Sequence, residues 1–106
     1  MAQDRLDLLE DVIRSRLGAD PGSSYVARLS AKGRAKIAQK VGEEAVETVI
    51  AAIQDDKAAL TSEAADLVFH LIVLLAECGV RLDDVRAELA RREGVSGLDE
   101  KASRTA

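Results

Sequence analysis

Residues 36–53 read KIAQKVGEEAVETVIAAI, and this stretch decides the fold. On a helical wheel at about 100° per residue, its lysines and glutamates fall in one stripe about 100° wide. The members of that stripe are Lys36, Lys40, Glu43, Glu44 and Glu47. In the C-terminal part of this stretch, apolar residues fill the rest of the helix circumference. The stripe is therefore narrow and bordered by side chains that favour burial. The pattern predicts a helix from about residue 34 to residue 53 with a row of charges on an otherwise apolar surface.

A second apolar helix follows, which Thr61 or Ser62 can cap and which ends near Gly79. Glu63, Asp66 and His70 form a similar polar strip on it, surrounded by Leu, Ile, Val and Phe. A helix that is apolar nearly all round lies in a core or at an oligomer interface. If the two helices pack antiparallel, their strips face each other, and up to five carboxylates converge.

The remaining chain also favours helices. Leu6, Leu9, Val12, Ile13 and Leu17 recur at helical spacing, and Gly18 can end that helix. The type of the short element at 25–29 stays undecided, a loop is expected around 30–33, and a last helix starts at Asp83 or Asp84 and ends before Gly94.

The expected fold class is therefore all-α, an antiparallel helical bundle of four to five helices whose core is completed by homodimerisation. We expect residues 1–94 to form this domain and residues 95–106 to form a short polar C-terminal tail. We expect the dimer interface to bury Phe69, Ile72 and neighbouring faces of the apolar helix.

Composition narrows the class of protein. The chain has 106 residues, a net charge of −4, one Cys and one His. A single Cys forms no internal disulfide, and an acidic chain is a poor general nucleic-acid binder. The charged N-terminus lacks the apolar region of a signal peptide, and the most apolar run, residues 67–76, is shorter than the roughly 20 residues of a membrane span. We expect a soluble, cytoplasmic protein that binds neither membrane nor nucleic acid.

The crowded carboxylates predict a metal site. Such groups repel one another unless a cation neutralises them, and oxygen ligands select Mg²⁺, with Mn²⁺ as the alternative. A solvated Glu-x-x-Glu pair is the competing interpretation for either strip taken alone. A di-iron site needs Glu-x-x-His on two helices, whereas this chain has only His70, for which we expect a neighbouring carboxylate as partner.

A basic segment precedes the acids. Residues 21–42 contain five bases and no acid. The candidates for binding an anionic substrate are Lys36, Lys40, Arg28 and Lys32. Lys36 and Lys40 share the carboxylate stripe, so they are placed to meet phosphates that a metal ion also holds. The segment predicts a phosphate-bearing small molecule as substrate.

Four segments carry a family resemblance. They are KIAQKVGEEAVETVIAA at 36–52, EAADLVFHLIVLL at 63–75, SYVARL at 24–29 and SGLDEKASR at 96–104. Together they closely resemble the phosphoribosyl-ATP pyrophosphohydrolase family of histidine biosynthesis. The acid pattern, Glu-Glu-x-x-Glu and then Glu-x-x-Asp, is similar to that of the wider all-α nucleoside-triphosphate pyrophosphatase (MazG-like) superfamily.

The resemblance implies an activity and a site. The activity is hydrolysis of the α–β phosphoanhydride of phosphoribosyl-ATP to phosphoribosyl-AMP and pyrophosphate. By analogy, Glu44, Glu47, Glu63 and Asp66 hold Mg²⁺, and Glu43 is an added ligand or orients water, so that Glu43, Glu44 and Glu47 are the candidate catalytic residues. The family is commonly homodimeric.

Two other functions stay open on the sequence. One is a house-cleaning pyrophosphatase of ordinary or damaged nucleoside triphosphates that uses the same metal site. The other is a non-catalytic helical dimerisation module whose acids are surface features. One His and one Cys leave no Ser-His-Asp or Cys-His nucleophile set, so direct attack by water is the expected route for a hydrolase.

Overall fold

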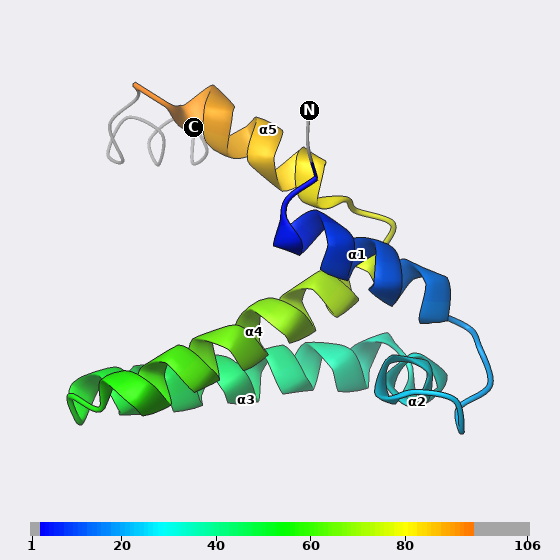
Figure 1. Cartoon of the computed structure of the whole chain (residues 1–106), viewed down its shortest axis with the longest axis horizontal. Coiled ribbons are helices and arrows are strands. Elements are labelled where there is room, and N and C mark those ends of the chain that lie inside the picture. The colour runs from blue at the N-terminus through cyan, green and yellow to red at the C-terminus, as the bar shows by residue number, and fades with distance from the viewer. Residues whose placement is uncertain (1–2, 95–106) are drawn as a thin grey trace.

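The computed structural model describes residues 3–94, which form five α-helices and no strand (Figure 1). The helices are α1 (Arg5–Arg16), α2 (Tyr25–Lys32), α3 (Arg34–Ile53), α4 (Lys57–Glu77) and α5 (Leu82–Arg92). This confirms the all-α class. The predicted tail, residues 95–106, lies outside the described residues.

Helices α3 and α4 form a long antiparallel pair, which brings the two polar strips of the sequence onto neighbouring helices (Figure 1). The turn between them contains Asp55, whose φ is 55°. Asp56 then caps α4, and its side chain accepts the backbone N–H of Ala59 at 3.0 Å. The expected cap at Thr61 or Ser62 is therefore wrong, because Asp56 offers an equally good capping oxygen about one turn earlier.

Residues 25–32 are helical, which settles the undecided element. Ser24 caps α2 by accepting the N–H of Ala27 at 3.0 Å. The expected loop at 30–33 is reduced to one residue, Gly33. It lies between the end of α2 and the start of α3, with a φ of 94°. Figure 1 shows α2 nearly end-on beside the start of α3, so the chain changes direction sharply at this glycine.

The core lies where α1, α2, α3 and α4 meet. It contains Ile13 of α1, Val26 and Leu29 of α2, Ile37 of α3, and Ile72, Val73 and Ala76 of α4. Ile72 is only 1% exposed within one chain. The expectation that Ile72 lies between subunits is therefore wrong, because its own chain already buries it. Phe69 is partly buried at the edge of this core.

The chain is less compact than its length predicts. A domain of about 100 residues has a radius of gyration of roughly 13 Å. Here the value is 15.9 Å. Apolar side chains remain exposed along the α3–α4 pair, at Val46, Val49, Ile50, Ile53, Val68 and Leu71. Unpartnered apolar faces of this kind are typical of a chain that buries them against a partner.

Helix α4 is long and apolar enough to cross a membrane by length and composition alone, with a mean hydropathy of 1.7 in its most apolar window. The core helix of a soluble protein meets the same criterion. Because α4 carries Glu63, Asp66 and His70 and packs along α3, its charges favour the role of a core helix. That the protein binds no membrane stays a prediction.

Candidate active site

Carboxylates from α3 and α4 meet between the two helices. One oxygen from each of Glu44, Glu63 and Asp66 lies within 4.8 Å of the other two. Glu44 is buried, Glu63 is half-buried and Asp66 is exposed, so the group runs from the interior to the surface. A small ion at this place would remain accessible to a substrate in solution.

The negative charge of this cluster is only partly compensated, because Lys40 lies near a single oxygen of Glu44. Oε2 of Glu44 and Oε2 of Glu63 are buried without a hydrogen-bond partner. A hydrogen bond with Glu47, which requires a proton on one of the two carboxyls, raises the pKa of Glu63 to about 7, with further contributions from burial and from the charges of Glu47 and Glu44. Buried polar atoms normally have hydrogen-bond partners. These two unpartnered carboxylate oxygens are therefore suited to binding a cation.

All four predicted metal ligands therefore approach one another. Glu44, Glu63 and Asp66 form the compact group, and Glu47 reaches it through Glu63. A set made only of carboxylate oxygens matches the ligand preference of a hard divalent cation such as Mg²⁺. The residues present thus fit the metal that the resemblance implies.

Glu43 lies apart from this cluster. Its carboxylate is exposed, accepts a hydrogen bond from Gln39 at 3.4 Å and lies 3.9 Å from Lys40 Nζ. The five-carboxylate cluster expected from the wheel is therefore a cluster of four, because Glu43 points toward its own helix's solvent side. Its role in orienting water stays a prediction.

Lys40 lies at the inner edge of the site. Its Nζ is 3.7 Å from Glu44 Oε1 and 3.9 Å from Glu43 Oε1. Burial by itself lowers the pKa of Lys40, but electrostatic interactions with Tyr25 and with the carboxylates of Glu43 and Glu44 outweigh it and leave that pKa raised. The ammonium group therefore stays charged beside the carboxylates. Of the other predicted substrate-binding residues, Lys36 is half-buried on α3, and Arg28 and Lys32 are exposed on α2.

His70 has a different partner from the expected carboxylate. Its Nδ1 lies 2.8 Å from the backbone oxygen of Asp66, and its Nε2 lies 2.8 Å from the hydroxyl of Tyr25. Because a carbonyl only accepts, Nδ1 donates to it, and Nε2 of the neutral ring accepts from Tyr25. Sequence reasoning missed this pairing, because Tyr25 comes from another helix and no spacing rule connects the two residues.

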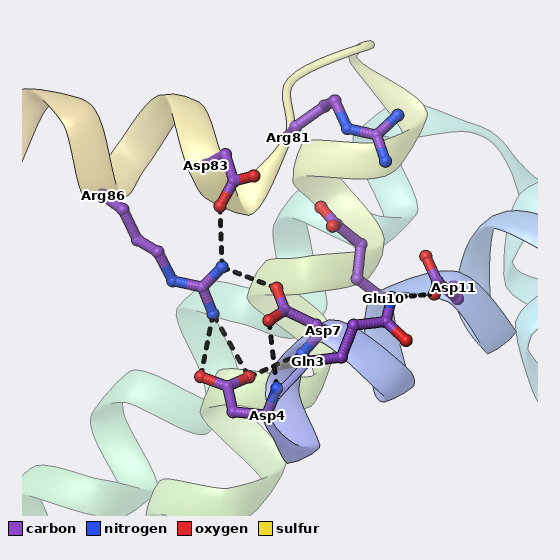
Figure 2. Close-up of a pocket in the computed structure, with 8 residues that line it drawn as sticks. All are labelled: Gln3, Asp4, Asp7, Glu10, Asp11, Arg81, Asp83 and Arg86. Carbon is purple, nitrogen blue, oxygen red and sulfur yellow. Dashed lines mark hydrogen bonds and ion pairs between the residues drawn. The ribbon is translucent and has the colours of Figure 1, made fainter. Parts of the chain in front are cut away.

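Apart from the carboxylate cluster, a hollow lies between α1 and α5, and Figure 2 shows its lining. Its volume is about 360 Å³, and none of the predicted site residues lines it. Arg86 fills the role of cation there, with hydrogen bonds of 2.6 Å to Asp7 and 2.9 Å to Asp83 and a longer contact to Asp4. These contacts lower the pKa of Asp7 and raise that of Arg86. Arg86 therefore neutralises part of the negative charge of this hollow, whose lining contains five acids and two arginines.

The sequence of this chain is similar to those of one protein family and of several of its named members. The family described as phosphoribosyl-ATP pyrophosphohydrolase matches residues 6–93. A phosphoribosyl-ATP pyrophosphatase of Rhizorhabdus wittichii is 67% identical over 99 residues, which cover 93% of each chain. One of Erythrobacter litoralis is 64% identical, covering 93% of this chain and 95% of its own. One of Paramagnetospirillum magneticum is 59% identical over 106 residues, covering 98% and 97%.

Proposed function

Because the chain belongs to the phosphoribosyl-ATP pyrophosphohydrolase family, we propose that it hydrolyses phosphoribosyl-ATP to phosphoribosyl-AMP and pyrophosphate in histidine biosynthesis. The single observation that carries this function is the convergence of Glu44, Glu63 and Asp66 within 4.8 Å. A phosphoanhydride is cleaved where negative charge on the transferring and leaving phosphates is neutralised and a water is aimed at phosphorus. A carboxylate cluster with an excess of negative charge and a lysine at its edge supports that chemistry.

The proposed cofactor is Mg²⁺, and Mn²⁺ is expected to substitute because it prefers the same ligands. Glu44, Glu47, Glu63 and Asp66 would hold it. When bound, the metal supplies positive charge for the phosphate oxygens and a polarised water. The two buried oxygens without partners, on Glu44 and Glu63, support this assignment.

The chain's own residues then divide the remaining work. Lys40, held within 3.7 Å of Glu44, is placed to bind a phosphate of the departing pyrophosphate, and Lys36 lies one turn before it. Glu43 is exposed beside Lys40 and is the candidate to orient the attacking water. Water is added across the α–β anhydride, so no protein nucleophile is required.

We further propose a cytoplasmic homodimer. The exposed apolar stripe of α3 contains Val46, Val49, Ile50 and Ile53 at helical spacing, and Val68 and Leu71 extend it onto α4. A second copy of the same chain would cover this face by two-fold symmetry. The extended shape of the single chain supports the same arrangement.

The test of the function is pyrophosphate release from phosphoribosyl-ATP, ATP and deoxynucleoside triphosphates in parallel, with and without Mg²⁺. The proposal expects metal-dependent release with a strong preference for phosphoribosyl-ATP. Equal turnover of all triphosphates would favour the house-cleaning activity, and no release from any of them would favour a non-catalytic module.

The metal assignment has its own test. Glu47→Gln and Asp66→Asn keep side-chain shape and remove a ligand charge, so each should abolish most activity while far-ultraviolet circular dichroism stays unchanged. Asp55→Asn is the matched control, because Asp55 is exposed in the α3–α4 turn at a positive φ that Asn accepts. Near-normal turnover of both site variants would overturn the assignment.

A further inference from the structure

Helix α2 carries a stripe of three exposed polar side chains that the proposed chemistry has not used. Tyr25, Arg28 and Lys32 follow one another at spacings of three and four residues, which places them on one face of the helix. The opposite face is buried through Val26, Ala27 and Leu29. The stripe is therefore fixed in direction by the core behind it.

The two cations of this stripe are uncompensated. Within residues 3–94, neither Arg28 nor Lys32 forms an ion pair, whereas Arg14, Lys40 and Arg86 each pair with at least one carboxylate. The surrounding sequence, residues 21–42, contains no acid. Two like charges one helical turn apart repel each other, so an anion between them would be bound favourably.

The stripe begins at the candidate active site. Tyr25 donates its hydroxyl to His70, which is 6% exposed and in turn donates to the backbone oxygen of Asp66. Its ring stacks on Phe69 at a centroid distance of 6.1 Å, yet Tyr25 remains 42% exposed. One part of the ring is thus held by the protein, and the rest is open to a ligand.

The opposite end of the stripe is separated from Tyr25 by the length of the helix. At a rise of 1.5 Å per residue, Lys32 is about 10 Å along the helix axis from Tyr25. A molecule that reached from the carboxylate cluster past Tyr25 to Arg28 and Lys32 would be long and would carry negative charge at both ends.

Phosphoribosyl-ATP has that form, and the inference rests on the proposed function at this point. It differs from ATP by a ribose phosphate attached to the purine, so one end carries the triphosphate and the other a single phosphate. We propose that the α2 stripe is the subsite that distinguishes phosphoribosyl-ATP from ATP, with Arg28 and Lys32 binding the ribosyl phosphate and Tyr25 stacking against the purine. A guanidinium binds phosphate through two parallel hydrogen bonds, and an aromatic ring packs on a base without a need for donors.

The experiment compares two ligands on one variant. Arg28→Gln/Lys32→Gln removes both cations, and its KM for phosphoribosyl-ATP is measured beside the Ki of ATP as a competitive inhibitor. Ribose 5-phosphate serves as a second inhibitor, because it carries only the distinguishing group. The matched control is Arg5→Gln/Lys57→Gln, which removes the same charge from two exposed positions outside the stripe. Thermal unfolding and circular dichroism establish that both variants are folded.

The inference expects the stripe variant to raise the KM for phosphoribosyl-ATP at least tenfold, to raise the Ki of ATP less than twofold, and to lose inhibition by ribose 5-phosphate. The control variant should keep all three constants within twofold. Equal losses for both nucleotides, an unchanged KM, or the same change in the control would overturn the subsite. A wild-type protein that releases no pyrophosphate from phosphoribosyl-ATP would instead contradict the proposed function, and the inference with it.

Discussion

Glu63 lies on α4 at the place where Glu44 and Glu47 of α3 approach it. The three carboxyls cannot all ionise there without mutual repulsion. A hydrogen bond with Glu47, burial and the charges of Glu47 and Glu44 together raise the pKa of Glu63 to about 7. In an unfolded chain the same carboxyl has a pKa of 4.5. The folded protein without metal therefore binds one more proton than the unfolded chain between these two values.

We predict that the metal-free protein loses stability as the pH rises. Glu63 stabilises the fold fully below pH 4.5, and this contribution disappears as the pH rises through about 7, because the folded state must then release its extra proton. Thermal unfolding in a chelator at pH 6 and pH 8 measures the loss. Glu63→Gln should flatten this part of the pH profile and raise the melting temperature at pH 8, and a variant with the wild-type profile would contradict the assignment.

Lys40 allows a second prediction for a single residue. As a helix partner of Glu43 and Glu44 it would stabilise α3 by only about 0.2–0.5 kcal/mol per pair. As a phosphate ligand it contributes more, so Lys40→Met should lower kcat/KM by at least about tenfold, or about 1.4 kcal/mol. Lys57→Met is the control, because Lys57 is exposed at the first turn of α4. Unchanged kinetics with a lower melting temperature would make Lys40 a structural partner only.

Apart from Leu82, which packs against the edge of the core, helix α5 is attached to the rest of the molecule by polar contacts. It has no buried residue, whereas each of the other four helices has at least two. Glu10 accepts the N–H of Leu82 at 2.7 Å, Arg14 donates to Val80 at 3.2 Å, and Arg86 joins α5 to α1 through Asp7 (Figure 2). Charge pairs at a surface are weakened by salt and lost when an acid is protonated, unlike buried apolar contacts.

We predict that Arg86→Met loosens α5 selectively. The backbone amides of α5 should exchange faster with deuterium, because the helix loses its main ion pair with α1, while exchange in α3 and α4 stays unchanged. The wild-type protein should show the same loosening as the pH falls below 3.8, where Asp7, whose pKa is lowered in the fold, takes up a proton. Arg5→Met is the control. Uniform protection of α5 in the Arg86 variant would show that other contacts hold it.

In the molecule as a whole, a single chain leaves an apolar stripe of α3 exposed to solvent, which is unfavourable without a partner. Ile53 is 79% exposed and Val46 is 59% exposed, and both lie on the helix that carries Glu44 and Glu47, two of the four proposed metal ligands. If a second copy covers this stripe, association also fixes α3 against α4 and so supports the geometry of the carboxylates. Activity and dimerisation should then be lost together.

We predict that Val49→Glu converts the protein to a monomer at low micromolar concentration. A charge at the centre of the stripe would be buried without a partner in a dimer, which costs several kcal/mol. Leu8→Glu is the matched variant, because Leu8 of α1 is 51% exposed and Val49 is 56% exposed. Light scattering measures the mass of both. A dimeric Val49 variant, or a monomeric Leu8 variant, would place the interface elsewhere.

The helices and the clustering of the carboxylates could be predicted from sequence because their signals are local. Periodicity predicted α3 at about residues 34–53, where the structure has it. The two acid strips predicted up to five converging carboxylates, and the structure brings together the four that the family resemblance implied. The errors arose where the outcome depends on contacts between distant segments. The partner of His70 comes from Tyr25, 45 residues away, and the burial of Ile72 depends on how α1 and α2 cover α4.

The backbone conformation of Gly33, which connects α2 and α3, favours a D-residue over an L-residue at this position. Its backbone, with φ 94° and ψ 168°, is close to the mirror image of an extended L-residue, a region that only glycine adopts freely. No atom lies within 4 Å of the position that a Cβ would take there, so the barrier to an L-side chain is conformational and not spatial. A D-alanine introduced at this position by chemical synthesis would fit the backbone, reduce the freedom of the unfolded chain and stabilise the protein by about 0.4–1 kcal/mol. The handedness of one methyl group would thus decide whether the corner between α2 and α3 is stiffened or broken.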